Sequence, residues 1–289
     1  MFKYYIINLL LYPIEIIIKF YLLLFFKKKL NFVILVIGNY ASSTTLWLQI
    51  LITLFKINYI NNISSKFYKC ILIGQLINKL LRLFNFKVNS TFYSEDGIAK
   101  GLMEPNEFGW YWRDFFTQEP SKHKIKSFRE NLNNISDFSG LPFLFKYSMT
   151  PNINSLQKNY KYFNSIKKKL IIIYPYRKKK LVVNSILNRK QNFKEFNSTY
   201  SFKKDGNLNK SINKQVQRIY NEHNSFLYNF NKDQILYINF EKFKNNKIIE
   251  IKKIVKFFKK FDIEMNDKNY IKRNLKNIKF KKDIKKVKL

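Results

Sequence analysis

The sequence predicts an α/β fold in which a central parallel sheet is flanked by helices. The prediction rests on three short apolar runs, at residues 32–37, 170–176 and 234–239. Each run has the length and the β-branched or aromatic content of a buried strand, and each is followed by a segment with a helical pattern. Strands that alternate with helices in this way are typical of parallel sheets. A fourth run, at 142–146, is shorter and ends at a lysine.

The composition allows a large core and favours anionic partners. The chain has 289 residues, of which 46% are hydrophobic, and its formal net charge is +35. Abundant Lys, Asn, Ile, Phe and Tyr with few Gly and Ala are typical of AT-rich coding, so a solvated lysine surface explains the charge as well as a dedicated anionic partner does. No nucleic-acid motif of known spacing is present, and we expect no specific nucleic-acid partner.

Cysteine and histidine are too scarce for a disulfide framework or a zinc site. The chain has one cysteine, Cys70, and two histidines, His123 and His223. We therefore expect no metal cofactor, and we do not expect a disulfide-bonded secreted protein. A histidine on a surface or a helix face is more often inert than catalytic, and we assign neither histidine a role.

Residues 1–30 are predicted to form an N-terminal apolar helix. The apolar stretch 4–26 is long enough to span a bilayer, but Pro13, Glu15 and Lys19 interrupt it, and three lysines follow at 27–29. Three arrangements remain open: a helix at a membrane interface, a membrane anchor, and a helix packed on the domain. The lysines favour the interface and an acidic membrane surface as partner. The location is accordingly membrane-associated or cytoplasmic, with an α/β domain at 31–265 and a basic tail at 266–289.

The turn after the first strand has the features of an anion site. Gly38 ends the strand, small and turn-forming residues follow, and an apolar helix begins near residue 46. A strand, a small polar loop and a helix together direct backbone N–H groups at an anion. Four consecutive hydroxyl residues add donors for phosphate oxygens: Ser42, Ser43, Thr44 and Thr45.

This turn resembles the donor loop of a known family. The sequence of residues 38–46, GNYASSTTL, is similar to the G-x-x-R-S-G-T-T-L loop of sulfotransferases. In that family the loop holds the 5′-phosphosulfate end of the donor 3′-phosphoadenosine 5′-phosphosulfate (PAPS). Ala41 stands where the family has Arg or Lys, and Ser43 where it has Gly. The resemblance implies a P-loop-NTPase-like parallel sheet, PAPS as co-substrate, and binding of the phosphosulfate by residues 42–45.

A second motif follows the strand at 170–176. Arg177 stands at the strand end and Ser185 lies eight residues later in a predicted helix. A guanidinium fork and a hydroxyl placed in this way converge on one phosphate. The spacing resembles the 3′-phosphate signature of sulfotransferases, I-x-x-x-R-(x)7-S. The alternative is that Arg177 is one of many cations and Ser185 an ordinary helix residue.

Three further residues are candidates for the chemistry. Lys146 ends a strand that resembles the family's L-x-x-K strand, and it is the candidate for charge stabilisation. Glu104 and Glu107, in the densest acidic and aromatic stretch of the chain, are candidates for the general base. The alternative for this stretch is a helix start at Glu104 and Pro105. Residues 240–243, FEKF, resemble the family's Y-E-D-L motif.

The sequence thus predicts a PAPS-dependent sulfotransferase that acts on a hydroxyl or amine of a small-molecule, glycan or lipid acceptor. The change at Ala41 leaves open a catalytically weak relative that binds nucleotide or anion, and the net charge leaves open a basic membrane-surface protein. The remaining expectations are a polar loop at 131–140, a mobile loop at 188–211, and a frayed tail or basic patch at 268–289.

Overall fold

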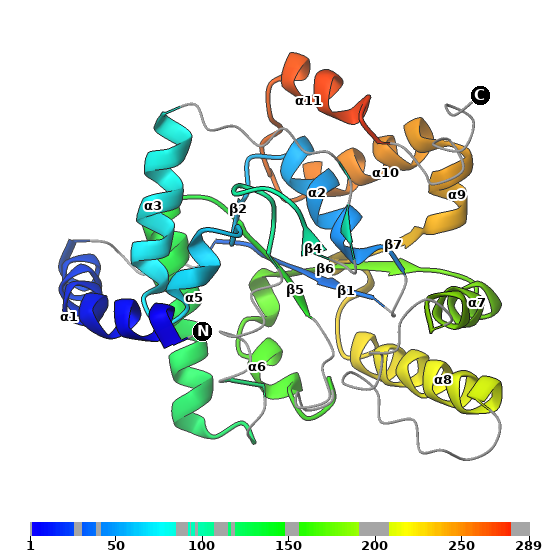
Figure 1. Cartoon of the computed structure of the whole chain (residues 1–289), viewed down its shortest axis with the longest axis horizontal. Helices are drawn as coiled ribbons and strands as arrows, with labels where there is room; N and C mark the ends of the chain where they lie inside the picture. The colour runs from blue at the N-terminus through cyan, green and yellow to red at the C-terminus, as the bar shows by residue number, and fades with distance from the viewer. Residues whose placement is uncertain are drawn as a thin grey trace.

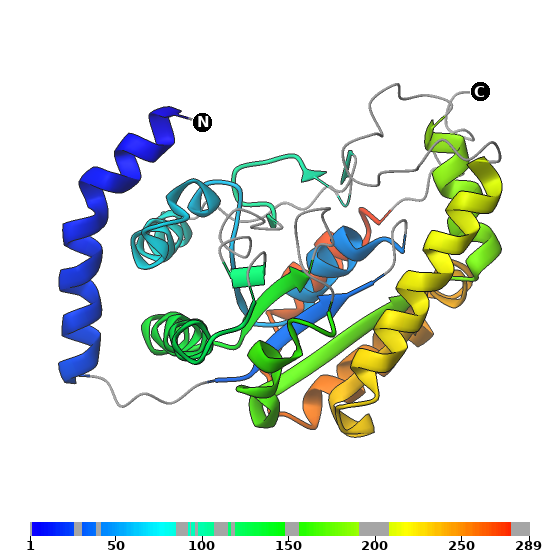
Figure 2. The same cartoon turned by 90° about the horizontal axis from the view of Figure 1, so that it is seen from below.

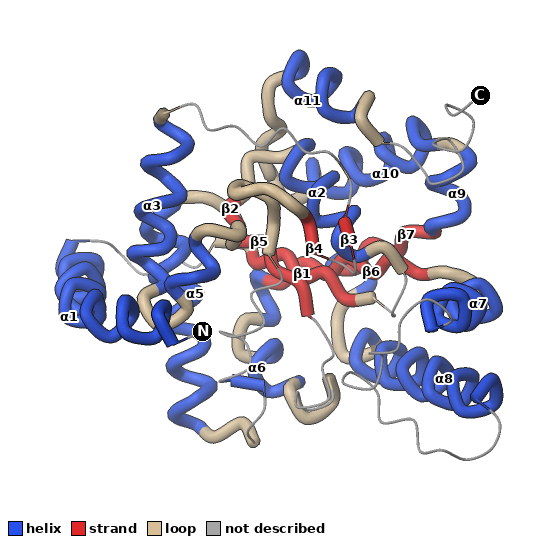
Figure 3. Tube along the Cα trace, viewed as in Figure 1, coloured by secondary structure: helices blue, strands red, loops and turns tan. Residues whose placement is uncertain are grey.

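A five-stranded parallel sheet forms the centre of the computed structural model (Figures 1 and 3). The structure describes residues 2–25, 31–38, 42–84, 92, 94–95, 98–106, 115–116, 119–147, 156–190 and 208–278. The strands in spatial order are β2 (Asn58–Tyr59), β5 (Phe143–Tyr147), β1 (Val33–Ile37), β6 (Leu170–Tyr176) and β7 (Ile235–Asn239). The predicted α/β fold, with a parallel sheet flanked by helices, is confirmed.

Both faces of the sheet are buried. Successive residues of a strand point to opposite sides, so one strand contributes side chains to two cores. Val33, Leu35 and Ile37 of β1 pack into one core, and Ile34 and Val36 pack into the other. The first core is covered by α3 (Ile71–Leu83), α5 (Lys122–Ser139), α6 (Tyr160–Asn164) and the end of α8 (Leu208–Leu227). The second is covered by α2 (Thr44–Leu54), α9 (Phe240–Asn245), α10 (Lys247–Lys259) and α11 (Lys268–Leu275).

Shorter elements complete the described chain. Helix α7 (Lys179–Lys190) packs against α8, and both contribute to a small separate apolar cluster. The remaining short elements are η1 (Ser64–Phe67), η2 (Lys167–Lys169), η4 (Lys232–Gln234) and the antiparallel pair β3 (Ser94–Glu95) and β4 (Ile98–Ala99). Helix α1 (Phe2–Phe25), the predicted N-terminal apolar helix, lies at one edge of the molecule (Figure 2).

The strand register brings four chain segments together at the carboxyl ends of the parallel strands. Val36 of β1 lies opposite Lys146 of β5 and Ile173 of β6, and Tyr176 of β6 lies opposite Asn239 of β7. Parallel strands end on the same side, where open α/β sheets bind ligands. The same end of the sheet is therefore the starting point of the segments that follow β1, β5, β6 and β7.

The predicted polar loop at 131–140 is wrong, because these residues continue α5. Ser121 caps the helix by accepting a hydrogen bond from the Lys124 N–H, and Gly140, with φ of 66°, ends it. Leu132 and Ile135 are buried on the inner face. Asn133 and Ser136 are buried beside them, so polar residues also occupy the inner face, and the polar composition of the segment disguised the helix.

Two other local expectations also differ from the structure. Residues 101–104 form a turn, and Pro105 pairs with Asn61 in an isolated bridge, so no helix begins at Glu104. Residues 268–275 form α11, which packs against α2 and begins at the capping residue Asp267, so this part of the expected tail is not frayed. Of the expected loop at 188–211, both ends are helical in α7 and α8, and residues 191–207 lie outside the described residues.

Candidate functional site

The turn after β1 is closed so tightly that only glycine fits at its start. A methyl group on Gly38 would lie 2.5 Å from Ser42 Oγ and 2.6 Å from Thr44 Cγ2. Ser42 and Thr45 are buried, and Ser43 adopts the left-handed conformation with φ of 63°. The side chains of Ser42 and Thr44 therefore pack directly against Gly38. Residues 39–41, including Ala41, lie outside the described residues.

The hydroxyl residues stand at the start of α2. Ser43 is the N-cap residue, but its side chain makes no capping hydrogen bond, and Thr44 and Thr45 occupy the first turn. The first N–H groups of a helix have no partner within the helix, and its dipole places partial positive charge there. An anion at this position would therefore meet both backbone donors and hydroxyls.

Arg177, at the end of β6, is held in place by contacts from two helices, α8 and α9. Its Nε donates to Glu241 Oε1 at 3.1 Å, and Glu241 belongs to α9. Its guanidinium carbon lies 5.0 Å from the centre of the Phe240 ring, and its backbone carbonyl accepts from the Tyr220 hydroxyl of α8. These contacts fix both the backbone and the side chain. Burial raises the pKa of Tyr220, so this hydroxyl stays protonated as a donor.

The turn and the Arg177 strand end are neighbours. Strands β1 and β6 pair directly, and a methyl group on Gly38 would also lie 3.2 Å from Pro175 Cγ. Thr44 and Pro175 thus approach the same glycine, and Arg177 follows two residues after Pro175. Ser185, half-buried, lies in α7, the helix that begins just after Arg177. The two predicted anion-binding elements are therefore neighbours at the carboxyl ends of β1 and β6.

Lys146 lies one strand away on the other side of β1. It is 9% exposed, and its register partner is Val36. Phe145 and Tyr147 face the first core, so alternation along β5 places Lys146 on the face that α2 covers. The lysine therefore shares a sheet face with the hydroxyl residues.

Glu104 is brought to α2 although it is distant in sequence. Glu104 is 4% exposed, and its carboxylate accepts a hydrogen bond from Gln49 Nε2 at 2.9 Å. Gln49 lies just over one turn after Thr45 on α2, so the acid is tied to the helix that starts at the candidate site. Glu107 lies outside the described residues.

Sequence reasoning included Glu241 in the motif at 240–243 without giving it a role, and it did not identify Tyr220 or Gln49. The position of Glu241 carried a usable signal, because it is one of only 19 acids and follows a predicted strand by two residues. Tyr220 and Gln49 are ordinary members of helical patterns, and their contacts depend on which helices the fold brings together.

The two histidines lie in opposite environments. His123 is exposed in the first turn of α5. His223 is fully buried on α8, edge-to-face with Tyr174, and burial lowers its pKa to about 4, so it is neutral at physiological pH. Among the described residues, no cluster of three or more His, Cys, Asp or Glu side chains could hold a metal ion.

Two solved structures share the fold. Sulfotransferase STF1 from Mycobacterium tuberculosis H37Rv superposes with a TM-score of 0.52 at 9% identity, covering 86% of this chain and 71% of STF1. Sulfotransferase STF9 from Mycobacterium avium gives a TM-score of 0.53 at 9% identity, covering 90% of this chain and 71% of STF9. A scan of protein-family models and a search of curated protein sequences found no match. The chain has the fold of sulfotransferases.

Proposed function

We propose that this chain is a sulfotransferase that moves the sulfuryl group of PAPS to a hydroxyl or amine of a small-molecule, glycan or lipid acceptor. The observation that carries the proposal is that the Gly38 turn and Arg177 adjoin at the ends of paired strands on a sulfotransferase fold. PAPS is charged at two places, its 5′-phosphosulfate and its 3′-phosphate. A donor of this kind needs two anion sites side by side.

The residues present suit this donor. The turn that wraps Gly38 leaves no room for a side chain, as expected where a backbone approaches a phosphate closely. Ser42, Ser43, Thr44 and Thr45, with the start of α2, would hold the phosphosulfate. Arg177 and Ser185 would hold the 3′-phosphate, and the Glu241 contact at Nε would orient the guanidinium. Bound PAPS supplies an activated sulfuryl group.

The chemistry assigned to this chain is proton removal and charge stabilisation. The Glu104 carboxylate takes the proton of the acceptor hydroxyl while the acceptor oxygen forms its bond to sulfur. The bond from sulfur to the oxygen of the 5′-phosphate breaks, and adenosine 3′,5′-bisphosphate leaves with that electron pair. Lys146 and the α2 N-terminus stabilise the negative charge that develops on the leaving oxygen. Glu107 is the second candidate for the base.

Ala41 sets the expected rate. The resemblance places a cation at this position, and removing one such stabilising group costs about 10²–10³ in rate in comparable sites. With no cation at position 41, we expect Lys146 to provide a larger share of the charge stabilisation than it would in an enzyme that has Arg or Lys at this position. Lys146→Ala should then reduce transfer by at least about 100-fold and leave donor binding within about threefold.

Transfer of labelled sulfate from PAPS to a panel of glycans, lipids and small alcohols tests the proposal. We expect transfer by the wild type, a large loss in Lys146→Ala, and no change in Arg129→Ala. Arg129 is an exposed cation on α5 and serves as the matched control. Binding of adenosine 3′,5′-bisphosphate without transfer would make the chain a nucleotide-binding relative. Absence of both would overturn the proposal.

A further inference from the structure

Helix α1 presents its apolar residues outward. Its buried residues Asn8, Glu15 and Leu22 recur at every seventh position, so one narrow stripe faces the protein. Only 17% of residues Tyr5–Leu22 are buried, and this is the one helix in the described chain long and apolar enough to cross a membrane. Seven large residues outside the stripe are 50 to 71% exposed: Leu9, Leu10, Ile16, Ile17, Phe20, Tyr21 and Leu24. A helix on a water-facing surface has the opposite arrangement.

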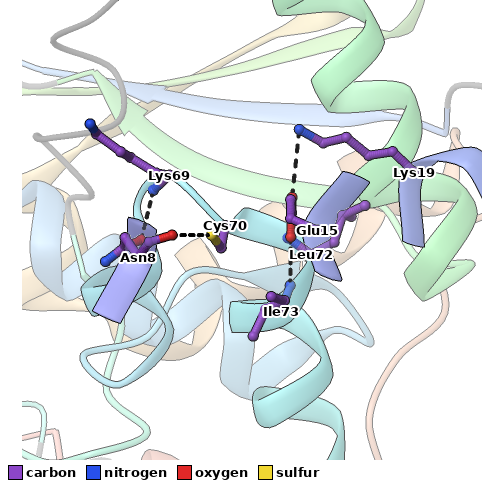
Figure 4. Close-up of polar contacts among 7 residues, drawn as sticks. All are labelled: Asn8, Glu15, Lys19, Lys69, Cys70, Leu72 and Ile73. Atoms are coloured by element: carbon purple, nitrogen blue, oxygen red, sulfur yellow. Dashed lines mark hydrogen bonds and ion pairs between the residues drawn. The ribbon is translucent and has the colours of Figure 1, made fainter. Parts of the chain in front are cut away.

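The Glu15 contacts fix the middle of α1 to the start of α3 (Figure 4). Its two carboxylate oxygens accept from the backbone N–H groups of Leu72 and Ile73, each at 3.1 Å. Lys19 Nζ lies 3.7 Å from the same carboxylate. Glu15 therefore supplies partners for N–H groups in the first turn of α3, where a negative charge is also favoured by the helix dipole.

The Asn8 contacts fix the first half of α1 in the same way (Figure 4). Its Nδ2 donates to the Lys66 carbonyl at 2.8 Å, and its Oδ1 accepts from the Lys69 N–H at 3.0 Å. The Asn8 carbonyl accepts from Cys70 Sγ at 3.2 Å. Polar contacts at both Asn8 and Glu15 hold the helix lengthwise along the protein.

Helix α3, which contacts α1, also exposes apolar residues. The two helices are in contact and lie side by side at one edge of the molecule, away from α7 and α8 (Figures 1 and 2). Leu76, Leu80, Leu83 and Phe84 of the α3 segment are 38 to 74% exposed. Their spacing of three to four residues places Leu76, Leu80, Leu83 and Phe84 near one side of that helix.

We propose that α1 lies flat in the headgroup region of a bilayer that contains anionic lipid, with its apolar face in the acyl boundary and its polar stripe docked on the protein. A spanning orientation would remove Asn8 and Glu15 from their backbone partners and place them in hydrocarbon, which is unfavourable. The flat orientation keeps these contacts and buries the exposed apolar side chains.

Charge favours a lipid surface over a second copy of the chain. The net charge is +35, and lysines follow α1 in the sequence at 27–29. Anionic headgroups attract this charge, whereas a second copy carries the same charge and repels it. The proposal does not depend on the sulfuryl transfer proposed above.

Flotation of the full chain with vesicles tests the proposal. Phosphatidylcholine vesicles are compared with vesicles that also contain about 30% phosphatidylserine, a fraction chosen to give a strong surface potential. The test variant carries Leu10→Gln, Ile17→Gln and Phe20→Gln. The matched control carries Tyr228→Gln, Ile248→Gln and Ile249→Gln, three large residues exposed elsewhere on the molecule. Circular dichroism checks that both variants keep the wild-type melting temperature, as exposed positions should.

The wild type and the control should float with the anionic vesicles, and the bound fraction of the test variant should fall at least about tenfold. Equal flotation of both variants, or no preference for anionic vesicles, would overturn the proposal. A dimer of the wild type in light scattering, together with a monomeric test variant, would identify a second copy of the chain as the occupant of the apolar face.

A tag at the N-terminus should be cleaved by protease added outside the vesicles. Protection of this tag would show a spanning helix and overturn the flat orientation.

Discussion

Two regions of this molecule differ in whether their buried polar groups have hydrogen-bond partners. Where α1 meets α3, the buried side-chain atoms of Asn8 and Glu15 all have partners, most of them backbone groups. Behind the ends of β6 and β7, the Tyr174 hydroxyl, both ring nitrogens of His223 and Glu241 Oε2 are buried without a hydrogen-bond partner among the described residues. Satisfied groups of the first kind hold elements together. Unsatisfied ones cost stability and call for another explanation. Of these residues, Glu241 binds Arg177 at the proposed donor site, and Tyr174 and His223 pack edge-to-face against each other.

The largest expected effect on nucleotide affinity is that of Gly38→Ala. The added methyl group meets Ser42 Oγ and Thr44 Cγ2 at 2.5 and 2.6 Å, so the buried side chains of Ser42 and Thr44 must move. Affinity for adenosine 3′,5′-bisphosphate, measured by calorimetry, should fall about 100-fold, or roughly 2.7 kcal/mol.

Gly140→Ala is the matched control for this substitution. Gly140 has φ of 66° with nothing within 4 Å of an added methyl group. The change should cost roughly 1–2 kcal/mol of stability through backbone strain. It should leave nucleotide affinity unchanged, and unaltered affinity in Gly38→Ala would contradict the close approach of the turn to phosphate.

His223 should make the protein sensitive to mild acid. Burial lowers its pKa to about 4, whereas an unfolded histidine titrates near 6.5. Only the unfolded state binds the proton between these values, so the free energy of unfolding falls as pH falls from about 6.5 to 4, by about 3 kcal/mol in total.

His223→Phe should remove this contribution, since phenylalanine keeps the ring contact with Tyr174. At pH 7 its stability should equal or exceed that of the wild type, because two unpaired nitrogens are lost. Urea unfolding at pH 7 and pH 4.5 measures both effects, with the exposed His123→Phe as control. An identical pH dependence for the wild type and His223→Phe would show that His223 is not buried as described.

Cys70 should report on the contact between α1 and α3. Burial raises the pKa of its thiol to about 11, so labelling by a thiol reagent at pH 8 should be roughly 100-fold slower than for an ordinary cysteine. Glu15→Ala removes the acceptor for two N–H groups of α3 and should speed labelling severalfold. A fast rate in the wild type would show that α1 does not cover Cys70.

Glu241→Gln has the smallest expected effect. Loss of the charged contact to Arg177 Nε should weaken nucleotide affinity about fivefold to tenfold through poorer positioning of the guanidinium. Glu250→Gln, which removes a carboxylate paired with Lys253 on α10, is the control. If both variants bind nucleotide equally well, Glu241 does not position Arg177.

The sequence predicted the elements that carry strong local patterns. Strands β1, β6 and β7 are continuous apolar runs, and Gly38 and Arg177 stand at the ends of two of them. The pairing of Arg177 with Glu241 was not predictable, because it depends on β7 lying beside β6. Helix α5 was missed in part, since its few buried residues are spread among many polar ones.

The orientation of α1 also needed the structure. Hydropathy indicated an apolar helix, and Glu15 and Lys19 were treated as interruptions of a membrane segment. The structure shows that Glu15 points to the protein and accepts from the start of α3. Composition cannot determine which side of a helix its neighbours cover, because that depends on distant segments such as residues 66–73.

The most direct test of the two adjoining anion sites compares two ligands on two proteins. Calorimetry would measure adenosine 3′,5′-bisphosphate and adenosine 5′-monophosphate, which lacks the 3′-phosphate, on the wild type and on Arg177→Ala. The substitution should weaken the bisphosphate at least about tenfold, as expected for a lost charged hydrogen bond, and should leave the monophosphate unchanged. Equal losses for both ligands, or no binding of either by the wild type, would contradict the account.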